Sequence, residues 1–393
     1  MNLRLLILAA LCIVACRGLC STQPGIEELM QRDDYISASL MVVAPGEASY
    51  AAGGHLALRM RCPVQNVDYT YEFDAALNDD QSLLWLYLTG RLNGEYVRLS
   101  TADFLAKAHK ENRTVDEYQL NLTPEQEVAL WAGADDAVDT PADLPFTPAE
   151  HNCCSMLLTL IESSTGADFF SNIQLHGALR KYMPDVFYSS PWTGLMWNTL
   201  MGTDFDRDAA PTSLLYPKIM GEQLCKANNP ANGKPLANFN TVSSAFSNAK
   251  HSTFTPTLAF ALLLAFTCLL TATNAAGRLQ RAARRFDWIL VAVTTATGCV
   301  LWLAFFASLF GTRPYANALM ALCTPLPIAL ALARKPALWL WWARAETAIA
   351  AITLASACFT WQMRVYGMWL PVAAILIRGL YYIHSNNPKT TTK

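Results

Sequence analysis

The sequence of 393 residues contains few charged side chains. Only 15% of its residues are Asp, Glu, Lys or Arg, against roughly 25% in ordinary globular chains, whereas 53% are hydrophobic. The net charge is −2, and no basic stretch is interleaved with aromatic residues. This composition excludes the basic surface typical of nucleic-acid-binding proteins and indicates a membrane protein.

Cysteines that can support a fold are also scarce. Of the 11 cysteines, three lie within residues 1–20 and four lie in apolar segments, where a thiol usually behaves as a small hydrophobe. The four others are Cys62, Cys153, Cys154 and Cys225. This number is too small for a disulfide scaffold, and the absence of C-x-x-C pairs argues against structural zinc. One catalytic thiol and at most one disulfide are compatible with it.

Apolar sequence is abundant and begins at the N-terminus. Residues 1–20 have a basic start, an apolar run and then small residues, which is the pattern of an export signal. We expect cleavage either before Ser21 or before Cys16, which follows the lipobox-like Ile13-Val14-Ala15. An uncleaved anchor is disfavoured because the run is shorter than the roughly twenty residues that span a bilayer.

Residues 251–393 have the composition of a membrane domain. Five segments are apolar enough to span: residues 254–275, 286–310, 315–333, 346–363 and 368–383. The cluster at residues 339–342 is expected at the membrane interface. Four arginines lie between the first two segments, and Arg334 and Lys335 follow the third. The positive-inside rule then places these loops in the cytoplasm and residues 21–250 outside it.

Residues 21–250 are expected to form an exported catalytic domain of the α+β class. Alternating apolar and polar residues predict strands at residues 35–43, 55–60, 68–74 and 117–122. Thr123 and Pro124 predict the start of one helix, and Asn152 that of a second helix to about residue 163. An irregular region is expected at residues 184–217, and a polar linker at 222–245.

Cys153 is the candidate nucleophile. It lies in the first turn of a predicted helix, where the partial positive charge of the helix N-terminus favours a thiolate. Asn152 can cap this helix and donate to a developing oxyanion. Cys154 is the rival, but its side chain points about 100° away, so only one of the two can face a substrate. A buried structural thiol and a strained Cys153–Cys154 disulfide are the alternatives.

His55 is the candidate partner of Cys153. It follows Gly53 and Gly54 at the start of a predicted strand, where backbone without side chains can lie close to a ligand. A thiolate–imidazolium pair attacks acyl groups and forms a thioester. A polar strand residue without a catalytic role is the alternative for His55.

The other candidates for the site are weaker. His151 is too close to the thiol in sequence to face it, His109 lies in a charged segment, and His176 is a reserve. Three carboxylates on the next strand share one face by parity and can orient His55: Asp68, Glu72 and Asp74. We favour Glu72.

These residues resemble a known family. A strand histidine ahead of an Asn-Cys helix start is similar to the circularly permuted NlpC-like papain fold, which includes the lecithin–retinol acyltransferase relatives. Residues 39–47, 54–59 and 152–153 more specifically resemble bacterial envelope proteins of the Lnb type, which include lipoprotein N-acyltransferases. Softer matches are Gly94-Glu95-Tyr96, residues 120–123, Leu215-Tyr216-Pro217, Arg313-Pro314, Asn317 and Pro325-Leu326.

The resemblance implies an exported, circularly permuted papain-like domain followed by an α-helical bundle of about five transmembrane helices. It places the bundle in the bacterial inner membrane and the catalytic domain in the periplasm. Cys153 and His55 would act with Glu72 as third member, supported by Asn152 and Gly54. The acyl donor would be a membrane phospholipid or a diacylglyceryl-lipoprotein, and the acceptor the N-terminal amine of a lipoprotein cysteine. This chemistry needs no metal, nucleotide or other cofactor.

Two departures from the family pattern leave other functions open. His151 stands where an acidic or aromatic residue is expected, and Cys154 replaces a Thr or Ser. One alternative is a cysteine amidase or peptidase acting on cell-envelope peptides, although such an enzyme needs no membrane domain. The other is a non-catalytic envelope membrane protein in which Cys153 is structural.

Overall fold

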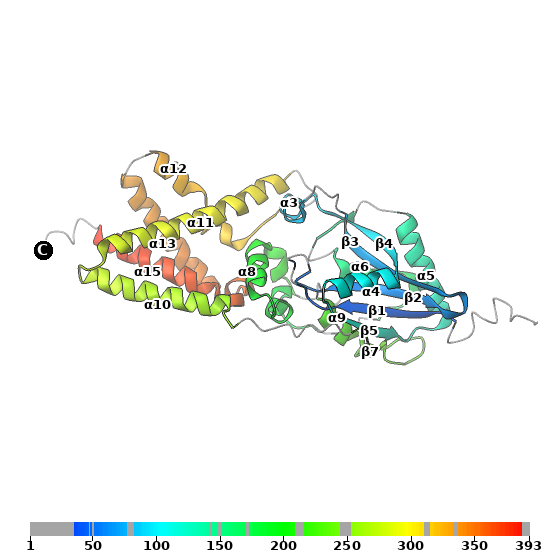
Figure 1. Cartoon of the computed structure of the whole chain (residues 1–393). Coiled ribbons are helices and arrows are strands. Elements are labelled where there is room, and N and C mark those ends of the chain that lie inside the picture. Colours follow the sequence, from blue (N-terminus) through cyan, green and yellow to red (C-terminus); the bar gives the residue numbers. More distant parts are fainter. Residues whose placement is uncertain are drawn as a thin grey trace, which may run out of the picture.

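A computed structural model gives the structure of the protein, and Figure 1 shows an elongated molecule with a β-sheet at one end and long helices at the other. The structure describes residues 35–46, 48, 51–76, 82–140, 144–147, 151–169, 173, 175–208, 216–243, 253–309, 315–333 and 336–386. The predicted export signal at residues 1–20 lies outside this part, as do Leu215, Arg313-Pro314, Arg334 and Lys335.

A seven-stranded antiparallel sheet forms the framework of the first part of the chain. Its strands, in the order in which they lie in the sheet, are β6 (Leu144–Pro145), β4 (Asn93–Ser100), β3 (Val67–Ala75), β2 (His55–Cys62), β1 (Ser37–Val43), β5 (Val115–Leu120) and β7 (Ala237–Ser243). The four predicted strands are confirmed as β1, β2, β3 and β5.

The prediction of a polar linker at residues 222–245 is wrong, because β7 lies within it and pairs with β5. Among the described strands β7 is the last at one edge of the sheet, a position where a polar sequence limits pairing with other chains. The structure also shows that residues 184–217 are not wholly irregular, since they contain an α-helix of ten residues.

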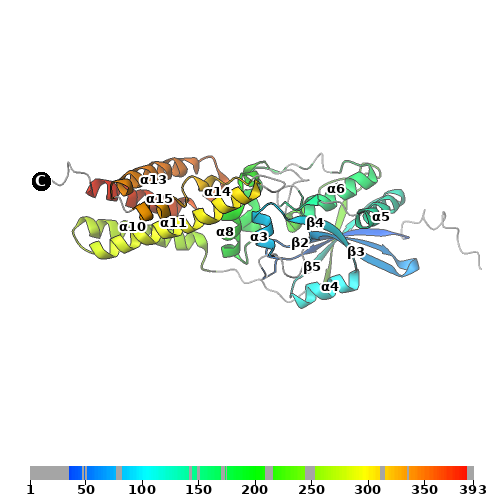
Figure 2. The same ribbon diagram turned by 90° about the horizontal axis from the view of Figure 1, so that it is seen from above.

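Helices cover the sheet on both faces (Figure 2). Two helices, α5 (Pro124–Asp139) and α6 (Cys153–Thr165), pack together against one face, and α4 (Thr101–Lys110) packs against the other. The predicted helix start at Thr123 is confirmed by a complete capping box with Gln126. Even-numbered residues of β1 pack toward α6, and odd-numbered ones pack toward α4. Alternation of side chains along β1 therefore explains why both faces of the sheet are apolar and covered by helices.

Short helices connect the sheet to the long helices: α3 (Leu83–Leu88), α7 (Met183–Val186), α8 (Pro191–Leu200) and α9 (Pro217–Leu224). The 3-10 turns are η1 (Pro63–Gln65), η2 (Leu179–Tyr182), η3 (Thr203–Asp206), η5 (Ala318–Met320) and η6 (Val365–Gly367). In Figure 1, α3 and α8 lie between the sheet and the long helices. They therefore form the junction of the two parts.

The last third of the chain is helical: α10 (Pro256–Ala275), α11 (Gln280–Ser308), α12 (Leu326–Ala333), α13 (Pro336–Ser356), α14 (Trp361–Arg364) and α15 (Trp369–Ser385). By length and composition, α10 and α11 can each cross a membrane, which confirms the first two predicted spans. The segments Ala337–Ser356 and Trp361–Gly367 form a third span only if they are counted together across a 97° bend. The count of five spans is therefore not confirmed for the described residues.

The later spans also differ in detail from the prediction. Residues 315–333 do not form one helix, because a 3-10 turn at Ala318–Met320 precedes the eight-residue α12. The helix expected from residue 346 begins at Pro336, so the tryptophan-rich residues 339–342 lie inside α13. The apolar composition of these segments predicted that they belong to the membrane domain, but it did not predict where the helices begin and end.

A buried polar network joins the two parts of the molecule. Arg180, which is fully buried, donates to the Asp206 carboxylate and to backbone and side-chain oxygens of Asn198. Gln362 exchanges hydrogen bonds with Asn198 and also donates to Asn317. A buried charge without partners is costly, so this network favours a single arrangement. It therefore holds the short helical segments η2, α8 and η3 against the turn η5 and the helix α14 (Trp361–Arg364) of the last third of the chain.

Candidate active site

Cys153 is positioned by the cap of α6. The Asn152 side-chain oxygen accepts hydrogen bonds from the backbone N–H groups of Cys154 (2.9 Å) and Ser155 (3.0 Å). The Ser155 hydroxyl accepts in turn from the Asn152 backbone N–H at 2.9 Å. Asn152 is fully buried, so the cap is rigidly held. The predicted helix start is confirmed, and it places Cys153 in the first turn of α6.

Gly54 sets the position of the backbone that carries His55. Its φ of +85° lies in the left-handed region, and a Cβ there would be 2.9 Å from the carbonyl oxygen of Val43. Gly53 has more room, because a Cβ at that position would meet only Phe187, at 3.9 Å. Only glycine allows this turn into β2 without strain, so Gly54 supports the site through the backbone.

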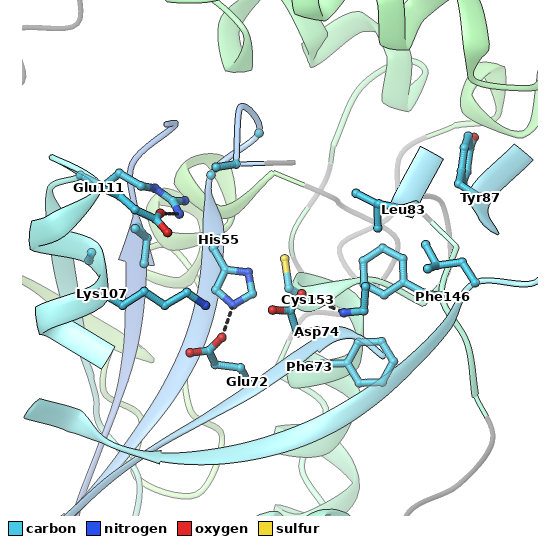
Figure 3. A pocket seen from close by; sticks show the side chains of 18 of the residues that line it. His55, Glu72, Phe73, Asp74, Leu83, Tyr87, Lys107, Glu111, Phe146 and Cys153 are labelled. Atoms are coloured by element: carbon cyan, nitrogen blue, oxygen red, sulfur yellow. Dashed lines mark hydrogen bonds and ion pairs between the residues drawn. The ribbon is translucent and has the colours of Figure 1, made fainter. Parts of the chain in front are cut away.

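His55 and Glu72 form a hydrogen-bonded pair at the end of the sheet. In the register of β2 and β3, Ala57 lies opposite Glu72, and His55 is two residues before Ala57 on the same face. The His55 Nε2 atom lies 3.0 Å from the Glu72 Oε2 atom. The Glu72 side chain is 3% exposed and that of His55 19%. With Nε2 engaged, Nδ1 is the ring nitrogen that is left to serve Cys153 (Figure 3).

The two other carboxylates on β3 have different partners. Asp68 accepts two hydrogen bonds from Arg59, at 2.9 and 2.6 Å, and one from the Thr101 hydroxyl at 2.6 Å. Asp74 lines the same cavity as Cys153, and its carboxylate accepts a hydrogen bond from the Ala75 backbone at 2.8 Å. Of the three carboxylates with the same parity, Glu72 is the one hydrogen-bonded to His55.

The environment of Cys153 favours its thiolate. A hydrogen bond from the Cys154 thiol is the largest effect that lowers the pKa of Cys153 well below its usual value. A hydrogen bond from His55, the positive charge of its ring and the Leu56 backbone N–H act in the same direction, whereas burial opposes them. Sequence reasoning missed the Leu56 donor, because a backbone N–H carries no sequence signal.

The environment of His55 favours its imidazolium. Burial lowers the pKa of His55, but hydrogen bonds and charge interactions with Cys153 and Glu72 outweigh burial and raise it above its usual value. The same contact with His55 outweighs burial for Glu72 and lowers the pKa of that carboxyl. The three groups therefore favour an ion pair, thiolate and imidazolium, with an ionised carboxylate behind it.

Cys154 is placed in the core rather than toward a substrate. Its side chain is fully buried among the apolar residues that pack against α6. Burial raises the pKa of Cys154 well above its usual value, and so does the neighbouring Cys153. A neutral thiol in this position is a hydrogen-bond donor to Cys153. The eight described cysteines are free, so neither Cys153–Cys154 nor Cys62–Cys225 is bridged in this structure.

The three remaining candidate histidines are not brought to the site. His151 contacts the Pro145 carbonyl through Nδ1 at 3.1 Å, whereas His109 and His176 are exposed to solvent. None of the three is among the described residues that line the cavity beside Cys153.

A cavity of about 440 Å³ opens beside the pair, within the 300–1,000 Å³ that is typical of ligand sites. One side, the charged limb, is lined by Lys107, Glu111 and Arg113. The opposite side, the apolar limb, includes Leu83, Tyr87, Leu92, Phe146, Trp197 and Met201. Figure 3 shows Lys107 and Glu111 on one side of His55, and Phe146, Leu83 and Tyr87 beyond Cys153 on the other.

The charged limb contains polar atoms that are ready to bind a ligand. Arg113 donates to the Ala44 carbonyl at 2.7 Å and to Glu111 at 3.0 Å. Its Nη2 atom is buried and has no hydrogen-bond partner in the described part of the chain, and the same holds for Glu72 Oε1. Buried polar atoms are normally paired. Sequence reasoning missed Lys107 and Arg113, because they lie on a helix and a turn far from both motifs.

Replacing Glu72 with glutamine is expected to weaken the pair without unfolding the site. A hydrogen bond to a charged group contributes about 1.5–3 kcal/mol, so we expect a loss of about 10- to 100-fold in the reactivity of Cys153. Glu72 raises the pKa of His55, so the pKa of His55 falls in the variant. The rate at which iodoacetamide alkylates Cys153 is measured as a function of pH. The change in rate that marks deprotonation of His55 should then occur at lower pH than in wild type. Asp74→Asn is the matched control, and an equal effect there would argue against the assignment.

Two family models match the chain. The model described as the Lnb N-terminal periplasmic domain matches residues 31–180, and the one described as the Lnb transmembrane domain matches residues 248–389. No curated protein and no solved structure matches the chain. The first match contains Cys153, His55 and Glu72, and the second contains all six helices from α10 to α15.

Proposed function

Because the chain belongs to the Lnb family and has its periplasmic domain followed by its membrane domain, we propose that it is a membrane-bound cysteine acyltransferase. The acyl chain passes through a thioester on Cys153 to an amine, which is the N-terminal amine of a lipoprotein cysteine. The observation that carries this proposal is the arrangement of Cys153, His55 and Glu72 beside a cavity with one apolar and one charged side.

The proposed first step breaks an ester of a phospholipid or of a diacylglyceryl-lipoprotein. The Cys153 thiolate attacks the ester carbonyl, and its carbon–oxygen double bond opens to an oxyanion. When the oxyanion collapses, the alkoxide leaves and takes the proton from Nδ1 of His55. The products are a Cys153 thioester, a free alcohol and a neutral His55.

The second step transfers the acyl chain. The acceptor amine attacks the thioester carbonyl, and neutral His55 removes the proton from the amine. Collapse of the intermediate forms the amide and returns Cys153 to its thiolate, so that the ion pair is restored. Glu72 stays ionised throughout and orients the imidazole ring.

Two donors are proposed for the oxyanion. One is the backbone N–H of Cys153, since the first N–H groups of a helix have no partner within that helix. The other is Asn152, the residue that the sequence also predicts as an oxyanion donor; its Oδ1 atom caps α6 and so holds the side chain beside Cys153.

The layout of the molecule supports a lipid substrate and a defined orientation. The turn between α10 and α11 and the arginine-rich start of α11 lie at the end of the helices far from the sheet (Figure 1). The positive-inside rule places that end in the cytoplasm, and the family match places the sheet domain in the periplasm. We propose an inner-membrane, multi-pass protein with residues 1–20 as signal, 21–250 as a permuted papain-like catalytic domain and 251–393 as membrane domain.

A cysteine amidase acting on cell-envelope peptides is the second candidate. The observation in its favour is the charged limb, because Lys107 and Arg113 can bind a peptide carboxylate. The apolar limb does not fit such a polar substrate, so acyl transfer is favoured. A non-catalytic role is disfavoured because an inert structural thiol has no need of a paired imidazolium and a buried carboxylate.

The proposal is tested by mass spectrometry of lipoprotein N-terminal peptides from cells that lack this protein. The cells are complemented with wild type, Cys153→Ala, Cys154→Ala or His55→Ala. We expect wild type and Cys154→Ala to restore the N-acyl group, and the other two variants to leave the deletion pattern. If the acyl pattern does not change on deletion, lipoprotein acylation is the wrong reaction, and peptidoglycan fragments should be examined for amidase products.

A further inference from the structure

The short helix α3 lies between the cavity and the membrane helices and presents a different face to each. Leu83 and Tyr87, one helical turn apart, line the cavity together with Cys153. Leu88 is buried in the apolar cluster that includes Leu301 and Ala304 of α11. The position of α3 is therefore fixed from two sides, by the site and by a membrane-spanning helix.

The side of α3 that carries Leu88 is apolar and is exposed one turn earlier in the helix, and we call this exposed part the outer face of α3. Leu84 is 38% exposed and Trp85 is 50% exposed, in a helix of only six residues. The neighbouring end of α11 exposes Leu303 and Phe306, and Leu309 follows it. These α11 side chains face lipid if α11 spans the membrane, and the exposed side chains of α3 lie beside this end of α11, because α3 packs against it through Leu88. Exposed apolar groups that adjoin such a surface mark a membrane contact.

A second aromatic contact lies on the other side of the junction. Trp192 of α8 is 42% exposed, stacks on Phe254 and donates its indole N–H to the Phe254 carbonyl at 2.9 Å. Phe254 immediately precedes α10, the first membrane helix. Tryptophan concentrates at the boundary between the head groups and the acyl chains. Trp85 and Trp192 therefore indicate the level of the outer leaflet on two sides of the protein.

We propose that α3 inserts its outer face into the outer leaflet and forms a lateral portal, through which the acyl chain of a lipid reaches Cys153. The chain passes beneath α3 from the bilayer into the apolar limb and does not cross water. The ester then stops at the thiolate, while the polar head group stays on the side of the charged limb. This role deepens the proposed function, because it assigns the acyl donor to lipids of the outer leaflet.

The test measures access to Cys153 and does not depend on acyl transfer. The full-length protein in phosphatidylcholine vesicles is treated with N-hexadecylmaleimide, which partitions into the bilayer, or with water-soluble N-ethylmaleimide. In both reactions the thiolate forms a carbon–sulfur bond across the maleimide double bond, and the adjacent ring carbon takes up a proton. Peptide mass spectrometry follows modification at Cys153 alone.

A carboxylate on the outer face of α3 should close the portal to lipid-borne reagents. For Leu84→Asp and Trp85→Asp we expect labelling by N-hexadecylmaleimide to slow by about tenfold, because a charge at the membrane surface is costly. Labelling by N-ethylmaleimide should stay within about twofold, since the thiolate itself is unchanged. Val64→Asp is the matched control: Val64 is 60% exposed in η1, next to the end of β2 opposite His55.

Fluorescence gives an independent readout of insertion. The fluorescence of Trp85 is the emission of wild type minus that of Trp85→Phe. This fluorescence should be quenched in vesicles of phosphatidylcholine that is brominated near the glycerol end of its acyl chains. Acrylamide in the water should have little effect on it. This measurement can be made in a Cys153→Ser background, where no acyl transfer is possible.

The outcomes separate this inference from the proposed function. The portal is overturned if both maleimides slow equally in the α3 variants, if wild type reacts only with the soluble reagent, or if acrylamide rather than bromolipid quenches Trp85. If the access and quenching results are as expected but no lipoprotein acylation is found, the portal stands and the proposed reaction fails.

Discussion

Cys153→Ala is expected to abolish acyl transfer, with a loss of about 10⁴-fold or more, as for removal of the nucleophile in other covalent enzymes. The reason is chemical, since alanine can form no thioester and water near the site is no substitute for an oriented thiolate. The measurement is the rate of transfer from a lipid ester to an amine by purified protein in vesicles. Alanine leaves only a small gap, because the substitution removes a single sulfur atom at the wall of an existing cavity.

Cys154→Ala is the matched control, because it removes a thiol from the adjacent residue of the same helix. Its hydrogen bond helps to lower the pKa of Cys153, and a hydrogen bond to a charged group contributes about 1.5–3 kcal/mol, so the thiolate fraction at acid pH should fall by about 10- to 100-fold. The acid limb of the rate–pH profile should move upward, because the pKa of Cys153 rises when this donor is lost. If Cys154→Ala instead removed activity as completely as Cys153→Ala, the nucleophile would be misassigned.

His55→Asn is expected to have the second largest effect, a loss of about 10³- to 10⁴-fold. Asparagine is too short and too weakly basic to exchange a proton with the thiol or with the leaving alkoxide. In the wild-type protein, His55 helps to lower the pKa of Cys153, so that the thiol stays ionised at pH values below its usual pKa. Without the imidazolium the pKa of Cys153 rises, and burial then acts unopposed by a positive charge.

Alkylation by iodoacetamide reports this change directly. In wild type we expect the rate to be nearly independent of pH between the lowered pKa of Cys153 and the raised pKa of His55. In His55→Asn the rate should fall as the pH drops below the ordinary thiol value of about 8.5, so that at pH 6 it is about 10²- to 10³-fold slower. A flat profile in the variant would show that His55 does not hold the thiolate.

The Cys153 and His55 variants are expected to keep the wild-type fold, because other residues hold the backbone around the site. The Asn152 cap, the turn at Gly54 and the β2–β3 register do not depend on the Cys153 or His55 side chains. Thermal unfolding should therefore shift by only a few degrees, since losses of about 1 kcal/mol move the midpoint by about 2–4 °C in chains of 150–250 residues. Larger shifts would indicate that activity is lost through unfolding.

Part of the site could be predicted from local sequence. Asn152 before an apolar helical pattern predicted the helix start and hence the position of Cys153 in the first turn of α6. Gly53 and Gly54 before β2 predicted a backbone position that requires glycine, and this holds for Gly54, whose φ is positive and whose Cβ would meet the Val43 carbonyl; the predicted approach to a ligand stays a prediction. These signals are local, because capping and left-handed turns depend on a few adjacent residues.

The third residue of the site could not be chosen from sequence. Parity placed Asp68, Glu72 and Asp74 on one face, and this holds in the structure. Which of them contacts His55 depends on the register between β2 and β3 and on competing partners, such as Arg59, which binds Asp68. Register and competition are properties of paired strands and not of either strand alone.

The amino-acid sequence was sufficient to predict an exported α+β part, an apolar helical part and the candidate pair Cys153 and His55. Hydropathy, caps and glycine turns carry this information over short distances. The partner of β7 in the sheet, the choice of Glu72 as the partner of His55 and the packing of α3 between the site and α11 follow from the three-dimensional structure alone. These features arise from contacts between segments far apart in the chain, whose local sequences do not identify their partners.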